Sequence, residues 1–162
     1  MIPQERDVRR YMERCIELAK ECKNYDIRKP FIGAIVLSHS GTLIGEGQKR
    51  LVEGTSYSIH AERVALDQAG NSARNGILVT TLEPCISTMD NVFKSCSEMI
   101  VERGIRMVFF GLYDNSPTVN SGAGAKYLIK RHIKVFQHES LNSVIRHELM
   151  PYRYNPPINT GI

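Results

Sequence analysis

Apolar residues recur with helical spacing near the N-terminus and then in short, strand-like runs. Between Asp7 and Lys23 they lie three and four positions apart, which predicts an amphipathic helix. Phe31–Leu37 is an apolar run too short for a core helix, and Thr42–Gly47 follows it after a His-Ser-Gly turn. These two runs predict a hairpin of two strands.

Helix and strand patterns alternate from residue 60 onward. Ser58 is positioned to cap a helix that carries His60 and stops at Gly70. The remaining strands are predicted over Ile77–Leu82, Arg106–Leu112 and Ile133–Phe136, and the remaining helices over Cys96–Arg103, Gly124–Arg131 and Leu141–Leu149. This alternation predicts an α/β layered sheet whose strands are mostly parallel in its second half, joined by right-handed crossovers.

Local signals fix the ends of two elements near the middle of the chain. Pro84 ends its strand before Cys85, because proline cannot continue a central ladder. Ser95 and Glu98 have the spacing of a capping box, which makes Cys96 the first residue of a helix.

Length and composition indicate one folded domain. The chain has 162 residues, of which 42% are hydrophobic and 23% charged, so disorder and fibrous repeats are excluded. We expect a single domain over residues 1–150 and a tail without periodicity over residues 151–162. The net charge of +4 is too small to indicate a protein built for the phosphate backbone, so nucleic acid is possible as a partner but not favoured.

The N-terminus becomes charged almost at once, and no apolar run approaches the ~20 residues that span a bilayer. The sequence therefore predicts neither a signal peptide nor a membrane helix, and a cytoplasmic protein. Four cysteines in a reducing compartment are expected to serve packing, metal binding or catalysis rather than disulfides.

Three side chains with metal-binding chemistry and one carboxylate occur at element boundaries. His60 and Glu62 open a helix, Cys85 follows a strand end, and Cys96 begins the next helix. Three protein ligands suit a catalytic zinc, because the fourth tetrahedral position stays open to water. Glu62 lies about 200° around the helix from His60, so we expect it to shuttle protons rather than bind metal.

This His-Ala-Glu, Pro-Cys and Cys pattern resembles the zinc-dependent nucleobase deaminases, in which His and two Cys hold the metal. The resemblance is greatest to the pyrimidine deaminase domain of riboflavin biosynthesis and extends over roughly residues 8 to 138. The segments that carry it are Ile32–Val36, Ile44–Gly47, His60–Glu62 with Ala65, Leu66, Ala69 and Gly70, Thr81–Cys85, and Asp114–Pro117 with Val119, Gly122 and Gly124.

The resemblance implies a three-layer α/β/α cytidine deaminase-like fold, with a mixed five-stranded sheet flanked by helices. It also implies one zinc ion per chain and an aminopyrimidine substrate that loses ammonia, with no reductase domain attached. Two segments depart from the family. Ten residues, 86–95, separate the cysteines where a shorter loop is usual, and residues 28–31 read Arg-Lys-Pro-Phe where the family has Pro-Asn-Pro. Both segments are expected to line the substrate pocket.

Other functions remain open from the sequence. The altered segments suit a cytidine or deoxycytidylate deaminase as well, and a flipped base of tRNA or single-stranded DNA is a further substrate for this chemistry. The absence of Trp and the small net charge count against a polynucleotide. A third hypothesis is a binding module that keeps zinc as a structural ion without turnover. Glu62 counts against it, because a purely structural zinc site has no need of a carboxylate that is not a ligand.

We expect substrate contacts from the site's backbone and from the loops beside it. The candidates are Ala61, Asp90, Asn91, Lys94 and Asp114. Cys15 and Cys22 are expected in the core, and His132, His138 and His147 at the surface or at helix ends. The apolar segments Ile77–Val79 and Met107–Phe110 exceed what one small sheet should cover, so a homodimer or homotetramer is expected.

Overall fold

The computed structural model describes residues 2–22, 29–55, 57–86, 94–115 and 121–150. The predicted tail, residues 151–162, lies outside this part of the chain. Among the described residues, no helix has the length and apolar character needed to cross a membrane.

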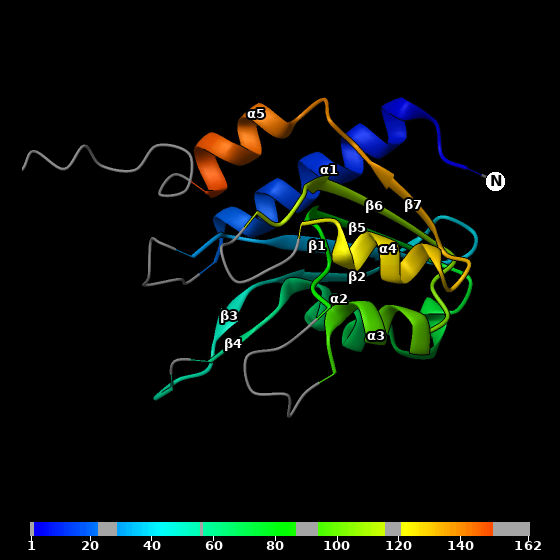
Figure 1. The fold of residues 1–162 in the computed structure, drawn as a ribbon, viewed down its shortest axis with the longest axis horizontal. Helices are drawn as coiled ribbons and strands as arrows, with labels where there is room; N and C mark the ends of the chain where they lie inside the picture. The colour runs from blue at the N-terminus through cyan, green and yellow to red at the C-terminus, as the bar shows by residue number, and fades with distance from the viewer. Residues whose placement is uncertain (1, 23–28, 56, 87–93, 116–120, 151–162) are drawn as a thin grey trace, which may run out of the picture.

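A mixed five-stranded sheet with the strand order β2-β1-β5-β6-β7 forms the middle layer of the molecule (Figure 1). Strand β1 runs antiparallel to both β2 and β5, whereas β5, β6 and β7 are parallel. The expectation of a hairpin followed by a mostly parallel second half is therefore confirmed, as is the α/β class.

The elements lie close to their predicted positions. In chain order they are α1 Glu5–Lys20, β1 Gly33–Leu37, β2 Leu43–Gln48, β3 Arg50–Leu51, β4 Ser58–Ile59, α2 Ala61–Ala69, the 3₁₀ turn η1 Gly70–Ala73, β5 Ile77–Leu82, α3 Cys96–Glu102, β6 Met107–Leu112, α4 Ala123–Ile129, β7 Lys134–Gln137, α5 Asn142–Val144 and the π-helical turn η2 Ile145–Leu149.

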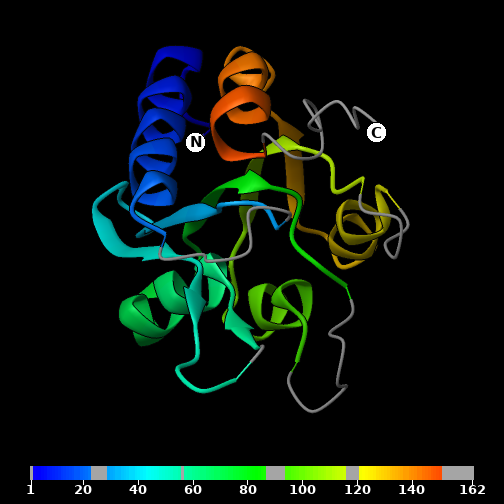
Figure 2. The same cartoon turned by 90° about the vertical axis from the view of Figure 1, so that its left-hand side faces the viewer.

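Helices cover both faces of the sheet. Helix α1 and the α5–η2 segment lie on one face, and α2 and α3 lie on the other (Figures 1 and 2). Glycines let two of these helices approach the strands closely. A Cβ at Gly33 of β1 would lie 1.9 Å from the carbonyl oxygen of Cys15 in α1, and one at Gly47 of β2 would lie 2.2 Å from that of Ala61 in α2.

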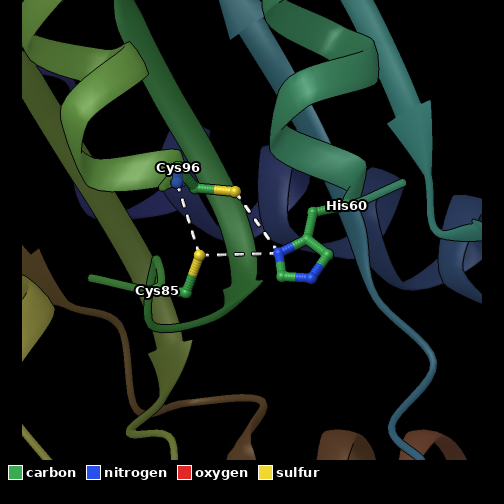
Figure 3. Close-up of side chains that lie close together, drawn as sticks. All are labelled: His60, Cys85 and Cys96. Carbon is green, nitrogen blue, oxygen red and sulfur yellow. Dashed lines mark hydrogen bonds between the residues drawn. The ribbon is translucent and has the colours of Figure 1, made fainter. Parts of the chain in front are cut away.

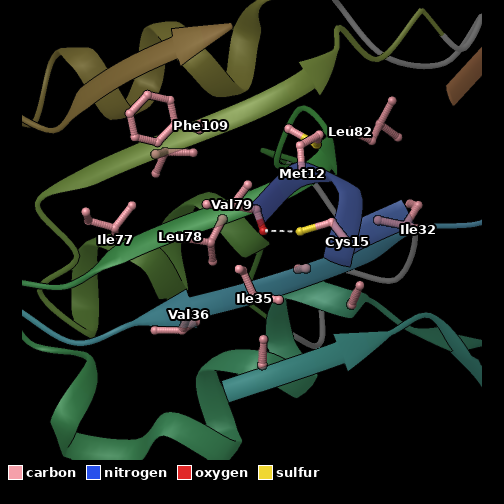
Figure 4. Packing of buried hydrophobic residues seen from close by; sticks show 14 of the residues in the cluster. Met12, Cys15, Ile32, Ile35, Val36, Ile77, Leu78, Val79, Leu82 and Phe109 are labelled. Atoms are coloured by element: carbon pink, nitrogen blue, oxygen red, sulfur yellow. Dashed lines mark hydrogen bonds between the residues drawn. The ribbon is translucent and has the colours of Figure 1, made fainter. Parts of the chain in front are cut away.

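The hydrophobic core fills the space on both sides of the central strands. Every residue of β1, β5 and β6 is buried. Figure 4 shows Met12 and Cys15 of α1 lying over Ile35 and Val79, with the Cys15 thiol 3.4 Å from the Val79 carbonyl oxygen that accepts its hydrogen bond. The core position expected for Cys15 is confirmed, while Cys22 is only half-buried and donates to Ile32.

Two expectations about local structure are wrong. Ser58 does not cap a helix, because it pairs with Leu51 in a two-stranded ribbon, β3–β4, where the sequence indicated only a polar loop. His138 is buried rather than at the surface, since its ring lies between Ser140 and Glu5. The predicted last helix is present over α5 and η2, with a π-helical second half, Ile145–Leu149.

The physical reason given for self-association does not hold. Ile77–Val79 and Met107–Phe110 are all buried within the single chain, because helices cover both faces of the sheet. A dimer or tetramer stays a prediction that follows from the family resemblance alone.

The contact between α1 and β1 generates a stability prediction. Gly33→Ala should lower the free energy of unfolding by about 3 kcal/mol or more, because the new methyl group meets helix backbone that cannot rotate away. Denaturant unfolding followed by circular dichroism measures this loss. Gly41→Ala is the matched control: its φ of +86° strains a side chain, but no atom lies within 4 Å, so a loss of about 1–2 kcal/mol is expected. A smaller loss for Gly33→Ala than for the control would contradict the packing described here.

Candidate active site

Three ligand-competent side chains converge at one end of the sheet. His60 is the residue before α2, Cys85 follows β5, and Cys96 is the first residue of α3. The Nδ1 atom of His60 lies 3.6 Å from the Cys85 sulfur and 3.4 Å from the Cys96 sulfur (Figure 3). The three ligand atoms all lie within 4.8 Å of one another.

This spacing fits a zinc ion. Zinc–sulfur bonds of about 2.3 Å and zinc–nitrogen bonds of about 2.0–2.1 Å in a tetrahedral site separate sulfur from nitrogen by about 3.5 Å. The two observed distances bracket that value. One imidazole and two thiols are also a donor set that zinc prefers.

The first turn of α3 positions Cys96 and donates a hydrogen bond to Cys85. The predicted capping box is present: Ser95 accepts from the Glu98 backbone at 3.2 Å, and the Glu98 carboxylate accepts from the Ser95 backbone at 2.8 Å. With its first turn ordered in this way, the helix directs the Cys96 N–H at the Cys85 sulfur, 3.3 Å away. A thiolate is favoured there, because the N-terminal end of a helix carries partial positive charge.

The two thiols hold their protons with different strength. The hydrogen bond from the Cys96 thiol lowers the pKa of Cys85, and His60 adds to this effect. The same contact, together with burial, raises the pKa of Cys96. A divalent cation would release the second proton, because metal binding favours the deprotonated ligands.

Glu62 lies beside the cluster and is almost completely buried. It is 2% exposed, and its Oε2 atom has no hydrogen-bond partner among the described residues. Burial raises the pKa of Glu62 to about 7. The carboxylate also contributes to the raised pKa of His60, whose main cause is the hydrogen bond with Cys85, so it faces the same small space. A buried carboxyl group with an unused oxygen and a pKa near neutrality can take up and return a proton.

Two arginine side chains form hydrogen bonds between α2 and α3, the helices at whose beginnings His60 and Cys96 lie. Arg63 of α2 donates to the carbonyl oxygen of Lys94, just before α3. In return, Arg103 at the end of α3 donates to the Leu66 carbonyl at 3.1 Å and to Asp67 at 2.8 Å. These contacts fix the distance between His60 and Cys96 from outside the site.

The candidate substrate residues lie in different surroundings. Ala61 is fully buried at the start of α2, and the Asp114 backbone N–H donates to Glu83 at 3.3 Å. Lys94 is exposed and pairs with Glu102 at 2.7 Å. Asp90 and Asn91 lie outside the described residues. A substrate contact by any of these five remains a prediction.

Two buried charged residues near the ligands were not identified from the sequence. Lys49, 7% exposed, donates to the Pro30 carbonyl oxygen at 3.4 Å. Glu83, 3% exposed, directly precedes Pro84 and Cys85. Glu83 could have been noticed in the sequence, because a carboxylate that continues an apolar strand is expensive to bury without a specific partner.

The sequence profile of the cytidine and deoxycytidylate deaminase zinc-binding region matches residues 5–112. This span contains His60, Glu62, Cys85 and Cys96. It also contains β1, β2, β5 and β6, so the profile covers four of the five strands of the main sheet.

Similar proteins differ in how much of their own length this chain covers. Riboflavin biosynthesis protein RibD of Aquifex aeolicus is 34% identical over 125 residues, which are 77% of this chain and 33% of that protein. A diaminohydroxyphosphoribosylamino-pyrimidine deaminase of Buchnera aphidicola is 34% identical over 129 residues, covering 77% of this chain and 80% of the relative. The chain thus spans about a third of the Aquifex protein but most of the Buchnera one.

Among solved structures, a diaminohydroxyphosphoribosylaminopyrimidine deaminase/5-amino-6-(5-phosphoribosylamino)uracil reductase from Thermotoga maritima superposes with a TM-score of 0.74 at 29% identity. The match covers 91% of this chain and 41% of that one. The five-stranded mixed sheet flanked by helices is therefore the fold of this deaminase group.

Proposed function

The chain belongs to the cytidine and deoxycytidylate deaminase family with a zinc-binding region, and from this we propose that it is a zinc-dependent hydrolytic deaminase of an aminopyrimidine. The observation that carries the proposal is the Oε2 of buried Glu62, which has no hydrogen-bond partner among the described residues and lies beside the cluster of His60, Cys85 and Cys96. A structural zinc site has no use for such a carboxylate.

In this proposal His60 and the two cysteines hold one zinc ion. Bound zinc supplies a water molecule whose pKa falls toward about 7. With zinc bound there, Glu62 would accept a proton from the attacking water, deliver it to the substrate nitrogen, and then carry the proton of the added hydroxyl to the departing amine. The exocyclic amine would thereby leave as ammonia, and a carbonyl oxygen would take its place. Burial suits Glu62 to this role, because a raised pKa lets the carboxyl hold the proton between the two steps.

The substrate proposed is the diaminopyrimidine nucleotide of riboflavin biosynthesis. The Buchnera relative, which is named for this reaction, supports it, since this chain covers most of that protein. Cytidine and deoxycytidylate are the alternative, because the family description names both. Nothing in the described residues favours a polynucleotide.

The ligand assignment predicts which cysteines the metal needs. Cys85→Ser, Cys96→Ser and His60→Ala should each purify with little zinc, whereas the wild type should carry about one ion per chain. Elemental analysis of gel-filtered protein measures the ratio. Cys22→Ser is the matched control, because its half-buried thiol donates to the Ile32 carbonyl oxygen and is not part of the ligand cluster, so zinc content should stay unchanged. A zinc-loaded Cys96→Ser variant would exclude Cys96 as a ligand.

Glu62→Gln should keep the fold and the zinc but lower kcat about 10²–10⁴-fold, because the amide cannot carry a proton. Steady-state kinetics and metal analysis on the same preparation test both halves of this statement. Glu102→Gln, an exposed carboxylate of α3 that pairs with Lys94, should retain wild-type turnover. Near-normal turnover by Glu62→Gln would assign proton transfer to another group.

Ammonia release from a substrate panel tests the reaction itself. Zinc-loaded protein should act on the diaminopyrimidine riboflavin precursor with a higher kcat/KM than on cytidine, deoxycytidylate, guanine, adenine or single-stranded DNA. Faster turnover of deoxycytidylate would replace the proposed substrate while keeping the chemistry. No ammonia from any compound would contradict the proposed function.

A further inference from the structure

The carboxylate of Glu83 is buried at the carboxyl end of β5, two residues before Cys85. It accepts three backbone N–H groups: those of Gly122 and Asp114 reach Oε1 at 3.0 Å and 3.3 Å, and that of Ala125 reaches Oε2 at 3.0 Å. Both oxygens are used, and charged acceptors make the stronger hydrogen bonds. These bonds offset the cost of burying the charge.

Two of these donors belong to the beginning of α4. The residue before this helix is Gly122, which has no side chain to cap it, and no side-chain cap from that position is present. Glu83 supplies the missing acceptor from a different element, since Ala125 is the third residue of α4. The third donor, Asp114, lies just past the end of β6, so one carboxylate joins β5, β6 and α4.

The residues that follow Glu83 are held by two helices. A Cβ at Gly124 of α4 would lie 1.9 Å from the Pro84 carbonyl oxygen, so the helix packs directly on this peptide. From α3, the Ser97 hydroxyl donates to the Pro84 carbonyl at 3.3 Å, and the Ser97 backbone donates to the Cys85 carbonyl at 3.0 Å. The segment from Glu83 to Cys85 therefore contacts the first turns of both α3 and α4.

We propose that Glu83 is a positioning residue of the metal centre, whose carboxylate fixes the Pro84–Cys85 backbone against α4 and so presents the Cys85 sulfur to His60 and Cys96. Glu83 acts through Cys85 and does not contact the metal. The proline ring stiffens the connection, because it fixes φ between the anchored carboxylate and the ligand. This inference rests on the zinc ligation proposed above.

Glu83→Gln tests the inference, because the amide has nearly the same shape but turns an NH₂ group toward a backbone N–H and loses the charge. Zinc affinity is measured by competition with a chromogenic chelator, and the cobalt(II)-substituted protein is examined by absorption spectroscopy. We expect zinc to bind about tenfold or more weakly. We also expect a changed sulfur-to-cobalt charge-transfer band, since the Cys85 sulfur is displaced.

Glu46→Gln is the matched control. Glu46, like Glu83, is a carboxylate that joins two elements, because it accepts from Arg14 of α1 at 2.7 Å and 3.0 Å. Glu46 is partly exposed, and its side chain bonds to α1 rather than to the Glu83–Cys85 segment. Its removal should lower the melting temperature while zinc affinity stays within about twofold of the wild type. Equal zinc affinity in Glu83→Gln and wild type, with only stability reduced, would overturn the inference and leave the ligand assignment intact.

A second measurement uses the wild type alone, in case Glu83→Gln does not fold. Coupling between two sites is reciprocal, so zinc held by Cys85 should strengthen the contact of Glu83 with α4. Hydrogen exchange of the Gly122 and Ala125 amides should therefore slow on zinc binding. Unchanged exchange at both amides would overturn the inference, and a wild type that binds no zinc would overturn the ligation and this inference together.

Discussion

Three donor atoms from three separate segments have to face a single point, and the arrangement of the site follows from that requirement. One donor comes from a strand end, and the other two come from the residues at the start of two helices. Strand ends and helix beginnings meet at the carboxyl edge of parallel strands in α/β sheets. The close approach of α2 to β2 at Gly47, and the contacts of Arg63 and Arg103, keep these segments in place.

Negative charge is buried in the same region and needs hydrogen-bond donors to stabilise it. Cys85, with its lowered pKa, and the carboxylate of Glu83 place negative charge close to the end of β5. Backbone N–H groups at the beginnings of α3 and α4 stabilise this charge by hydrogen bonding, because the first N–H groups of a helix have no acceptor within their own helix. Glu62 lies in the same region, no described residue donates to its Oε2, and burial raises its pKa. The two buried carboxylates thus differ in their surroundings: both oxygens of Glu83 accept hydrogen bonds, which suits the proposed positioning role, whereas Glu62 keeps a free oxygen within the described residues, which suits the proposed proton transfer.

The sequence predicted elements where a local signal was sufficient. The capping box of Ser95 and Glu98 placed Cys96 at the helix start, and apolar runs placed β5 and β6 almost to the residue. Prediction failed where contacts between distant segments determine the surroundings of a residue. His138 is buried where its ring meets Glu5, which is far away in the sequence. The three donors of Glu83 lie more than 30 positions away, so no pattern around residue 83 reveals them.

X-ray absorption at the zinc K-edge is a direct test of the ligand set, because it counts the atoms around the metal without requiring a substrate. We expect a four-coordinate ion with two sulfur atoms at about 2.3 Å and two nitrogen or oxygen atoms at about 2.0 Å. The two sulfurs would be those of Cys85 and Cys96, and the lighter atoms would be His60 Nδ1 and a water molecule. A shell with one sulfur, or with three or four, would contradict the site described here.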